Sequence, residues 1–107
     1  MKKRDSMWVL VMFDLPTLTA YQRRDASHYR NHLKHTGFDM VQLSVYAKYI
    51  VNAGYLPTLY KKIEEVIPDD RKVRALSISD VEWSKTMLFQ GKKRVQVELA
   101  TQQLLIF

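Results

Sequence analysis

One acidic residue stands at a position that suits metal chemistry. Asp14 directly follows residues 8–13, a continuous apolar run that is short enough for a buried strand. A carboxylate at the end of a rigid strand can bind Mg²⁺, whose remaining ligands are often waters and phosphate oxygens. Nothing else nearby completes a metal site within one chain, so two copies meeting at a dimer axis would share the ion. The alternative is that Asp14 only caps the turn before Leu15 and Pro16.

Basic side chains recur at helical spacing in the segment that follows. Arg23, Arg30 and Lys34 fall on one row of a helix, and Arg24 begins the neighbouring row. Such a face suits contacts with phosphate groups, which provide affinity without reading the base sequence. The N-terminus adds three further basic residues, Lys2, Lys3 and Arg4. The sequence therefore predicts a nucleic-acid-binding surface, and the alternative is an ordinary solvated helix face.

Three histidines lie in the same segment, but they do not predict a metal site. His28 and His32 are four residues apart, which places both on one helix face. However, the Glu that a zinc hydrolase needs between them is missing, and no third ligand is apparent. Together with His35 they are interpreted as surface histidines. The sequence also contains no cysteine, which excludes disulfides and zinc–thiolate sites.

Length and charge restrict the class of protein. The 107 residues provide for one domain, and 47% hydrophobic residues are enough to build its core. Seventeen Lys and Arg residues against 11 Asp and Glu give a net charge of +6, which favours a polyanionic partner. The apolar run near the N-terminus is far shorter than the roughly 20 residues that a membrane span needs. We therefore expect a cytoplasmic protein without a membrane partner.

The first half of the chain shows the pattern of a strand, a helix and two further strands. Residues 8–13 predict a central strand. Thr19 and Gln22 form a capping box that predicts the start of a helix ending at Gly37. The apolar stripe of this helix consists of Leu18, Ala26, Tyr29 and Leu33. Residues 38–51 predict two short strands joined by a tight hairpin.

The second half of the chain predicts another helix and further strands. Apolar residues recur at helical intervals from Leu56 to Ile67, and Pro68 ends this pattern. Residues 72–79 and residues 87–89 are strand candidates. The resulting order, βαββαβ, predicts an α+β fold of the ferredoxin-like type. In this two-layer sandwich both helices cover the same face of the sheet.

The predicted sandwich leaves the other sheet face without a cover. The single domain spans residues 1–107, with a core at about residues 7–91 and a C-terminal tail at residues 92–107. An exposed apolar sheet face must contact a second protomer or a nucleic acid. The apolar residues 104–107 predict an extra C-terminal strand that pairs with a neighbouring sheet edge. We therefore expect a homodimer.

Three segments, taken in order, resemble one protein family. The first segment is Met12-Phe13-Asp14-Leu15-Pro16, the second is Gly37-Phe38 at the end of the basic helix, and the third is Met-Val-Gln-Leu-Ser-Val-Tyr at residues 40–46. In the order and spacing of these segments the chain resembles the CRISPR-associated protein two family. It is most similar to the members from type II systems. The resemblance covers residue 7 to about residue 91.

The resemblance implies a function in CRISPR antiviral defence. Members of the family are ferredoxin-like homodimers that bridge two dimers of CRISPR-associated protein one, the integrase. In spacer acquisition they help to hold the duplex DNA that becomes a new spacer. Some members are Mg²⁺-dependent endonucleases on RNA or duplex DNA, which implies that Asp14 is the catalytic metal ligand. Many relatives outside type II carry a basic residue where this chain has Met40 and Val41, so a phosphate-binding partner for Asp14 is missing there.

The same motif match implies roles for four further residues. Gln42 and Ser44 are expected to be structural, whereas Phe13 and Tyr46 are expected to line the cleft between two protomers. Two other interpretations remain open. An RNA-recognition module shares the βαββαβ order and stacks single-stranded RNA on aromatic residues, but its aromatic motif lies on the third strand. A free-standing, toxin-like ribonuclease would use the same chemistry at Asp14.

Overall fold

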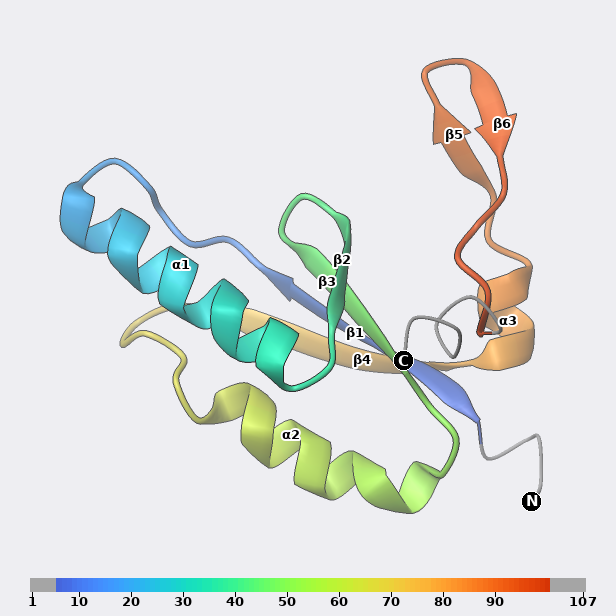
Figure 1. Cartoon of the computed structure of the whole chain (residues 1–107), viewed down its shortest axis with the longest axis horizontal. Helices are drawn as coiled ribbons and strands as arrows, with labels where there is room; N and C mark the ends of the chain where they lie inside the picture. Colours follow the sequence, from blue (N-terminus) through green and yellow to red (C-terminus); the bar gives the residue numbers. More distant parts are fainter. Residues whose placement is uncertain (1–5, 101–107) are drawn as a thin grey trace.

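A four-stranded antiparallel sheet organises the fold (Figure 1). The structure is a computed structural model, and it describes residues 6–100. The strands are β1 (Met7–Phe13), β2 (Asp39–Gln42), β3 (Val45–Ile50) and β4 (Val73–Ser79). They lie in the order β2-β3-β1-β4, and β1 pairs antiparallel with both β3 and β4. This strand order confirms the predicted α+β, ferredoxin-like fold.

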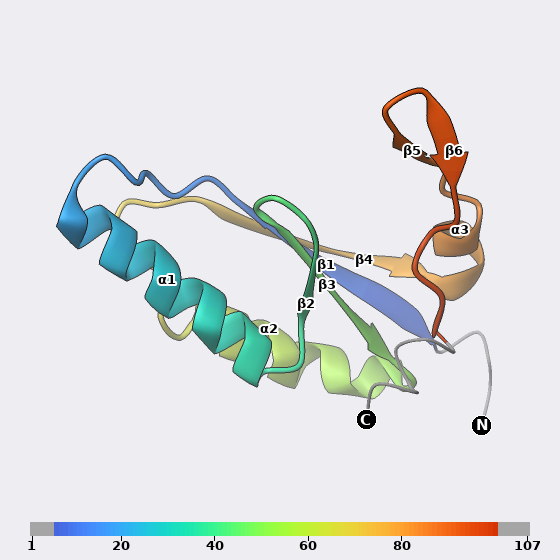
Figure 2. The same ribbon diagram turned by 45° about the horizontal axis from the view of Figure 1, so that its top comes forward.

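Two helices cover one face of this sheet, as Figures 1 and 2 show. They are α1 (Ala20–His35), which joins β1 to β2, and α2 (Leu56–Glu64), which follows the short 3₁₀ helix η2 (Ala53–Tyr55) after β3. The capping box that the sequence predicts is present. Gln22 N–H donates to Thr19 Oγ1 at 3.0 Å, and Thr19 N–H donates to Gln22 Oε1 at 3.1 Å. The prediction that Leu18 belongs to the apolar stripe of this helix is wrong, because the helix begins only after Thr19 and Leu18 is 88% exposed.

The face of the sheet beneath the helices forms a core that is complete within one chain. Its buried residues are Val9, Val11, Phe13, Tyr29, Leu33, Phe38, Tyr46, Ile50, Leu59 and Ile63. Phe13 and Tyr46 stack with ring centroids 5.6 Å apart, and Phe13 meets Tyr29 edge to face. The expectation that Phe13 and Tyr46 line a dimer cleft is therefore wrong. The pleat of β1 and β3 directs both side chains toward the helices, where they pack inside their own protomer.

The opposite face of the sheet is covered at one end by a short helix that the sequence pattern did not predict. This helix, α3 (Asp80–Ser84), begins at the cap residue Ser79. Trp83 stacks on Trp8 with ring centroids 4.9 Å apart. The Trp8 indole N–H donates to Asp80 at 2.9 Å, and the Trp83 indole N–H donates to the carbonyl oxygen of Glu98 at 2.7 Å. The remainder of this face, which we call the open face, carries Leu10 and Leu76 as cross-strand partners.

The strand predicted at residues 87–89 is present, but it belongs to a hairpin of its own. β5 (Leu88–Gln90) pairs with β6 (Lys93–Val95) in a separate two-stranded sheet. Gly91, with φ +65°, provides the tight turn between them. Figures 1 and 2 show that this hairpin projects away from the main sheet. The C-terminal strand predicted at residues 104–107 lies outside the described residues.

Among residues 6–100, no helix combines the length and apolar composition that crossing a bilayer requires.

Candidate nucleic-acid site at the end of β1

Asp14 is the first residue after β1, and its side chain is exposed. The residue before it is fixed from two directions. The Phe13 side chain is buried in the core, and the Phe13 N–H donates to the carbonyl oxygen of Ser44 at 3.1 Å. Within residues 6–100 the Asp14 carboxylate has no hydrogen bond or ion pair. Asp14 is therefore an exposed acceptor group on a rigid support, which is the arrangement that a metal site needs.

Within residues 6–100, the acidic and histidine side chains of one chain do not assemble a complete metal site. In the described part of the protein, no three His, Asp or Glu residues lie close enough to hold an ion together. His32 contacts the carbonyl oxygen of Lys62, and His35 Nδ1 lies 2.9 Å from the carbonyl oxygen of Asn31. The exposed Asp14 carboxylate fits a Mg²⁺ ion only if waters, phosphate oxygens or a second copy of the chain provide the other ligands.

The basic residues of α1 do not all have the same surroundings. The Arg23 guanidinium donates to the carbonyl oxygens of Thr17 and Leu18, at 3.2 and 3.3 Å. Arg23 therefore holds the loop after Asp14 against the start of the helix. Arg24 and Lys34 are exposed, and Arg30 is half-buried. No ion pair of these residues occurs within residues 6–100, where the Lys85–Glu82 pair is the single salt bridge.

The other predicted residues occupy the turn beside Asp14 or fall outside the described range. Gln42 is the last residue of β2 and is exposed. Ser44 lies in the following turn with φ +63°, and its carbonyl oxygen anchors Phe13 as described above. The basic residues Lys2, Lys3 and Arg4 lie outside the described residues.

The structure adds one basic residue that the sequence pattern did not single out. Arg74 of β4 is exposed and pairs in register with Met12, two residues before Asp14. A basic residue therefore lies on β4, the strand that pairs with the end of β1 from which Asp14 follows. Positions 40 and 41, where many relatives carry the basic residue, are apolar in this chain. The sequence signal was present in the alternation of residues 72–79, where Lys72 and Arg74 share a strand face.

Two aromatic residues that could have indicated an RNA-recognition module are not available for stacking. Trp8 and Phe38 are 0% and 1% exposed, respectively, so neither ring can contact a base. Base stacking of the kind such modules use requires rings on an open sheet surface. The burial of both residues is a structural argument against this interpretation.

Comparisons with known proteins agree with the resemblance seen in the sequence. Residues 7–86 match the family model described as CRISPR associated protein Cas2. The protein named CRISPR-associated endoribonuclease Cas2 from Paracidovorax avenae is 34% identical, and the match covers 94% of each chain. The protein of the same name from Flavobacterium psychrophilum is 36% identical over 95% of this chain and 89% of its own length.

A solved structure described as "Crystal structure of cas2" has a similar fold. The two structures superpose with a TM-score of 0.57, covering 88% of this chain and 99% of the other at 17% sequence identity. This agreement supports the strand order and helix placement given above. The match to the family model extends from β1 to the residues just after α3, and it includes Asp14 and Arg74. The chain therefore belongs to the CRISPR-associated protein Cas2 family.

Proposed function

We propose that two copies of this protein form a homodimer that acts in CRISPR spacer acquisition. The dimer binds duplex DNA and bridges two dimers of the integrase, CRISPR-associated protein one. Family membership supports the CRISPR role. The observation that carries the proposal is the open face of the sheet, because residues 6–100 of a single copy leave part of it exposed.

Three features of the open face and its surroundings support association of two copies. Leu76 is 43% exposed on β4 beside the partly buried Leu10. In the described residues β4 has only β1 as a neighbour, which leaves its other edge unpaired. Phe89 in the projecting β5–β6 hairpin and Met87 just before it are 53% and 57% exposed. Apolar patches and unpaired strand edges of this kind are usually covered by another chain.

The bridging role is tested by reconstitution with the integrase. We expect the purified protein to be a dimer that joins two integrase dimers into one particle, with a mass that analytical ultracentrifugation can measure. A matched sample without this chain should contain integrase dimers alone. A strictly monomeric protein at working concentrations, or a particle that forms equally well without it, would contradict the bridge.

Three basic residues of α1, the exposed Arg24 and Lys34 and the half-buried Arg30, support binding of the DNA backbone. We expect that replacing Arg24, Arg30 and Lys34 together by Gln weakens duplex binding about equally for all sequences. It should also reduce the slope of log K against log salt by about one unit for each phosphate that the variant no longer neutralises. Arg23 is left intact in this variant because it holds the loop that carries Asp14. Fluorescence anisotropy at several salt concentrations measures both quantities.

The control for this experiment removes the same charge elsewhere. Lys61, Lys85 and Lys92 are exposed and lie outside α1, and their joint replacement by Gln lowers the net charge equally. This control should reduce affinity much less than the α1 variant. If both triple variants lose affinity equally, only the net charge matters and α1 is not the DNA-binding face.

A second proposed activity is Mg²⁺-dependent cleavage of phosphodiester bonds in RNA or duplex DNA. The relatives named endoribonuclease support it, as do the free carboxylate of Asp14 and the neighbouring Arg74. Asp14 would hold the ion, which would polarise the phosphate and activate a water. Arg74 is positioned to attract the negative charge of the phosphate.

The nuclease proposal is tested with Asp14→Asn, which keeps the shape of the side chain and removes its charge. Cleavage by the purified protein should require Mg²⁺ and should be absent in this variant. Asp70→Asn is the matched control because Asp70 is exposed and has φ +62°, a conformation that Asn also tolerates. Cleavage that persists in Asp14→Asn would exclude Asp14 as the metal ligand.

Gene deletion distinguishes the proposed function from that of a toxin-like ribonuclease. If the protein were such a ribonuclease, deletion of its gene would leave spacer acquisition unchanged.

A further inference from the structure

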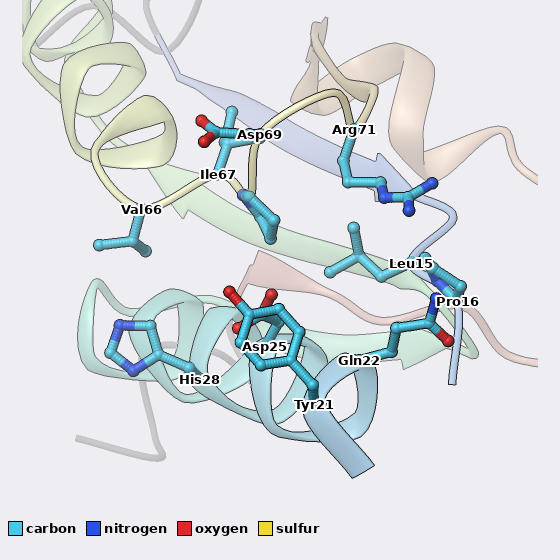
Figure 3. Close-up of a pocket in the computed structure, with 11 residues that line it drawn as sticks. Leu15, Pro16, Tyr21, Gln22, Asp25, His28, Val66, Ile67, Asp69 and Arg71 are labelled. Carbon is cyan, nitrogen blue, oxygen red and sulfur yellow. The ribbon is translucent and has the colours of Figure 1, made fainter. Parts of the chain in front are cut away.

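A pocket of about 440 Å³ opens between α1 and the loop that joins α2 to β4 (Figure 3). Its volume is in the range of sites that bind small molecules. One end of the pocket is formed by Leu15, the residue that follows Asp14. Arg30 and Lys34 of the proposed DNA-binding face lie on the other flank of the buried stripe of α1, so these two residues and the pocket are on different sides of the helix.

The walls of the pocket offer an aromatic surface facing apolar side chains. Tyr21 extends from α1 into the pocket and is 68% exposed. The loop contributes Ile67 and Pro68. Tyr21 makes no hydrogen bond within residues 6–100 and contributes nothing to the core, so folding does not explain an aromatic residue at this position. A planar ring could lie between Tyr21 and the loop.

Three charged residues line the pocket, the exposed Asp69 of the loop and the two that the proposal uses, Asp25 and Arg71. Asp25 lies one turn of α1 after Tyr21 and is half-buried, whereas Arg71 extends from the loop on the side of Leu15 (Figure 3). Neither side chain has an ion pair in the described part of the chain. A matching ligand would carry hydrogen-bond donors near Asp25 and an anionic group near Arg71.

We propose that this pocket binds one unpaired nucleotide, with a preference for guanine. The base stacks on Tyr21, and the carboxylate of Asp25 accepts hydrogen bonds from the two neighbouring N–H groups on the Watson–Crick edge of guanine. The phosphate lies at Arg71. The other plausible occupant is an Arg side chain of a protein partner, but the guanidinium of Arg71 would repel it. The inference rests on the proposed action on nucleic acid and deepens it, because it adds a nucleotide pocket lined by Leu15, the residue that follows Asp14.

The proposal is tested by titrating the full-length protein with guanosine monophosphate in the absence of metal. Cytidine and uridine monophosphates are the base comparators, and guanosine tests the contribution of the phosphate. Tyr21→Ala should weaken binding about tenfold, a factor within the range for stacking on an aromatic side chain. Asp25→Asn should lower the preference for guanine over cytosine about tenfold, as expected when a pair of hydrogen bonds to the base is removed. Arg71→Gln should weaken binding of the monophosphate and leave guanosine unaffected.

Matched variants separate these effects from changes in folding or net charge. Tyr21→Phe keeps the ring and should bind like the unchanged protein, and Asp70→Asn and Arg94→Gln change equivalent charges outside the pocket. Absence of binding at millimolar nucleotide would overturn the proposal. So would Tyr21→Ala and Asp25→Asn variants that bind each nucleotide as the unchanged protein does. Binding of arginine amide instead of the nucleotide would also overturn it, in favour of a protein partner.

The titration is repeated with Asp14→Asn so that the pocket and the nuclease are judged separately. Nucleotide binding by a variant without cleavage activity would support the pocket independently of the chemistry. Conversely, Asp14-dependent cleavage by a protein that does not bind the nucleotide would leave the nuclease proposal intact and refute the pocket.

Discussion

The two faces of the main sheet differ in how completely one chain covers them. Under the helices, Val9 and Val11 are fully buried among residues of α1 and α2. On the opposite face the same strand presents Trp8, which α3 covers, and then Leu10, which lies beside the exposed Leu76. One strand thus serves a core that folding completes and a surface that residues 6–100 leave partly exposed. Because exposed apolar surface is usually covered by another molecule, we expect the proposed second copy to bind at the open face.

The largest expected effect tests the helix-covered face. Leu33 is 0% exposed in α1, and we expect Leu33→Ala to lower the free energy of unfolding by about 3 kcal/mol because the cavity it leaves cannot close fully. Urea unfolding followed by circular dichroism, at one fixed protein concentration, measures this change. The control is Leu43→Ala, at a position that is 83% exposed, which should stay within about 0.5 kcal/mol. Similar losses in both variants would mean that Leu33 does not belong to a closed core.

The helix-covered face was also the part that the sequence predicted best. The capping box at Thr19 and the stripe of Ala26, Tyr29 and Leu33 are local patterns, and all of them are present in α1. The sequence could not tell which way the residues of β1 face, because the run is apolar on both sides. For this reason the motif match could place Phe13 in a dimer cleft, whereas the pleat turns it into the core.

The next effect concerns the covered end of the opposite face. We expect Trp83→Leu to lower the free energy of unfolding by about 2 kcal/mol, since it removes the ring stack with Trp8 and the indole hydrogen bond to Glu98. The near-ultraviolet circular dichroism of Trp8 should change at the same time. Trp83→Phe keeps an aromatic ring and should recover part of the loss. A Trp83→Leu protein as stable as the unchanged one would show that α3 is not part of the folded core.

The features that the sequence pattern did not reveal depend on contacts between distant segments. α3 is too short to produce a helical pattern, and it is fixed by Trp83 packing on Trp8, 75 positions earlier in the sequence. The apolar residues of β5 predicted a strand but not its partner, which is β6. In the candidate site, the position of Asp14 at the end of a strand was predicted from local pattern. The pairing of Met12 with Arg74 depends on sheet register, which a single sequence does not reveal.

A pH-dependent effect tests how tightly the helices close the covered face. The Tyr29 hydroxyl donates to the carbonyl oxygen of Ile63 at 3.0 Å, and burial raises the pKa of Tyr29 from 10.0 to about 12. In the unfolded chain Tyr29 has its ordinary pKa of 10.0, so it loses its proton at a lower pH than in the folded protein. The stability that the protonated Tyr29 hydroxyl provides is therefore complete below pH 10 and is lost as the pH approaches about 12.

The measurement compares the unchanged protein with Tyr29→Phe across this range of pH. At neutral pH we expect the variant to be less stable by about 1 kcal/mol, the usual contribution of one hydrogen bond. Above pH 10, the difference between the two proteins should shrink and then reverse. A difference that is constant with pH would contradict the buried, hydrogen-bonded state of Tyr29. Other tyrosines titrate in both proteins and therefore cancel in the comparison.

The smallest effect on folding is expected on the open face, where it separates the two faces most clearly. Leu76 is already 43% exposed, so Leu76→Asp should change the free energy of unfolding of a single chain by only about 0.5 kcal/mol or less. If a second copy covers this face, the same change places a charge in the interface and should convert the dimer to monomer. Analytical ultracentrifugation should then show the loss of the dimer, whereas urea unfolding of the same sample should show little change in stability. Leu18→Asp, at a position 88% exposed outside the sheet, should leave both unchanged. A Leu76→Asp protein that remains dimeric would move the interface to another surface, and a protein that unfolds would place Leu76 in the core.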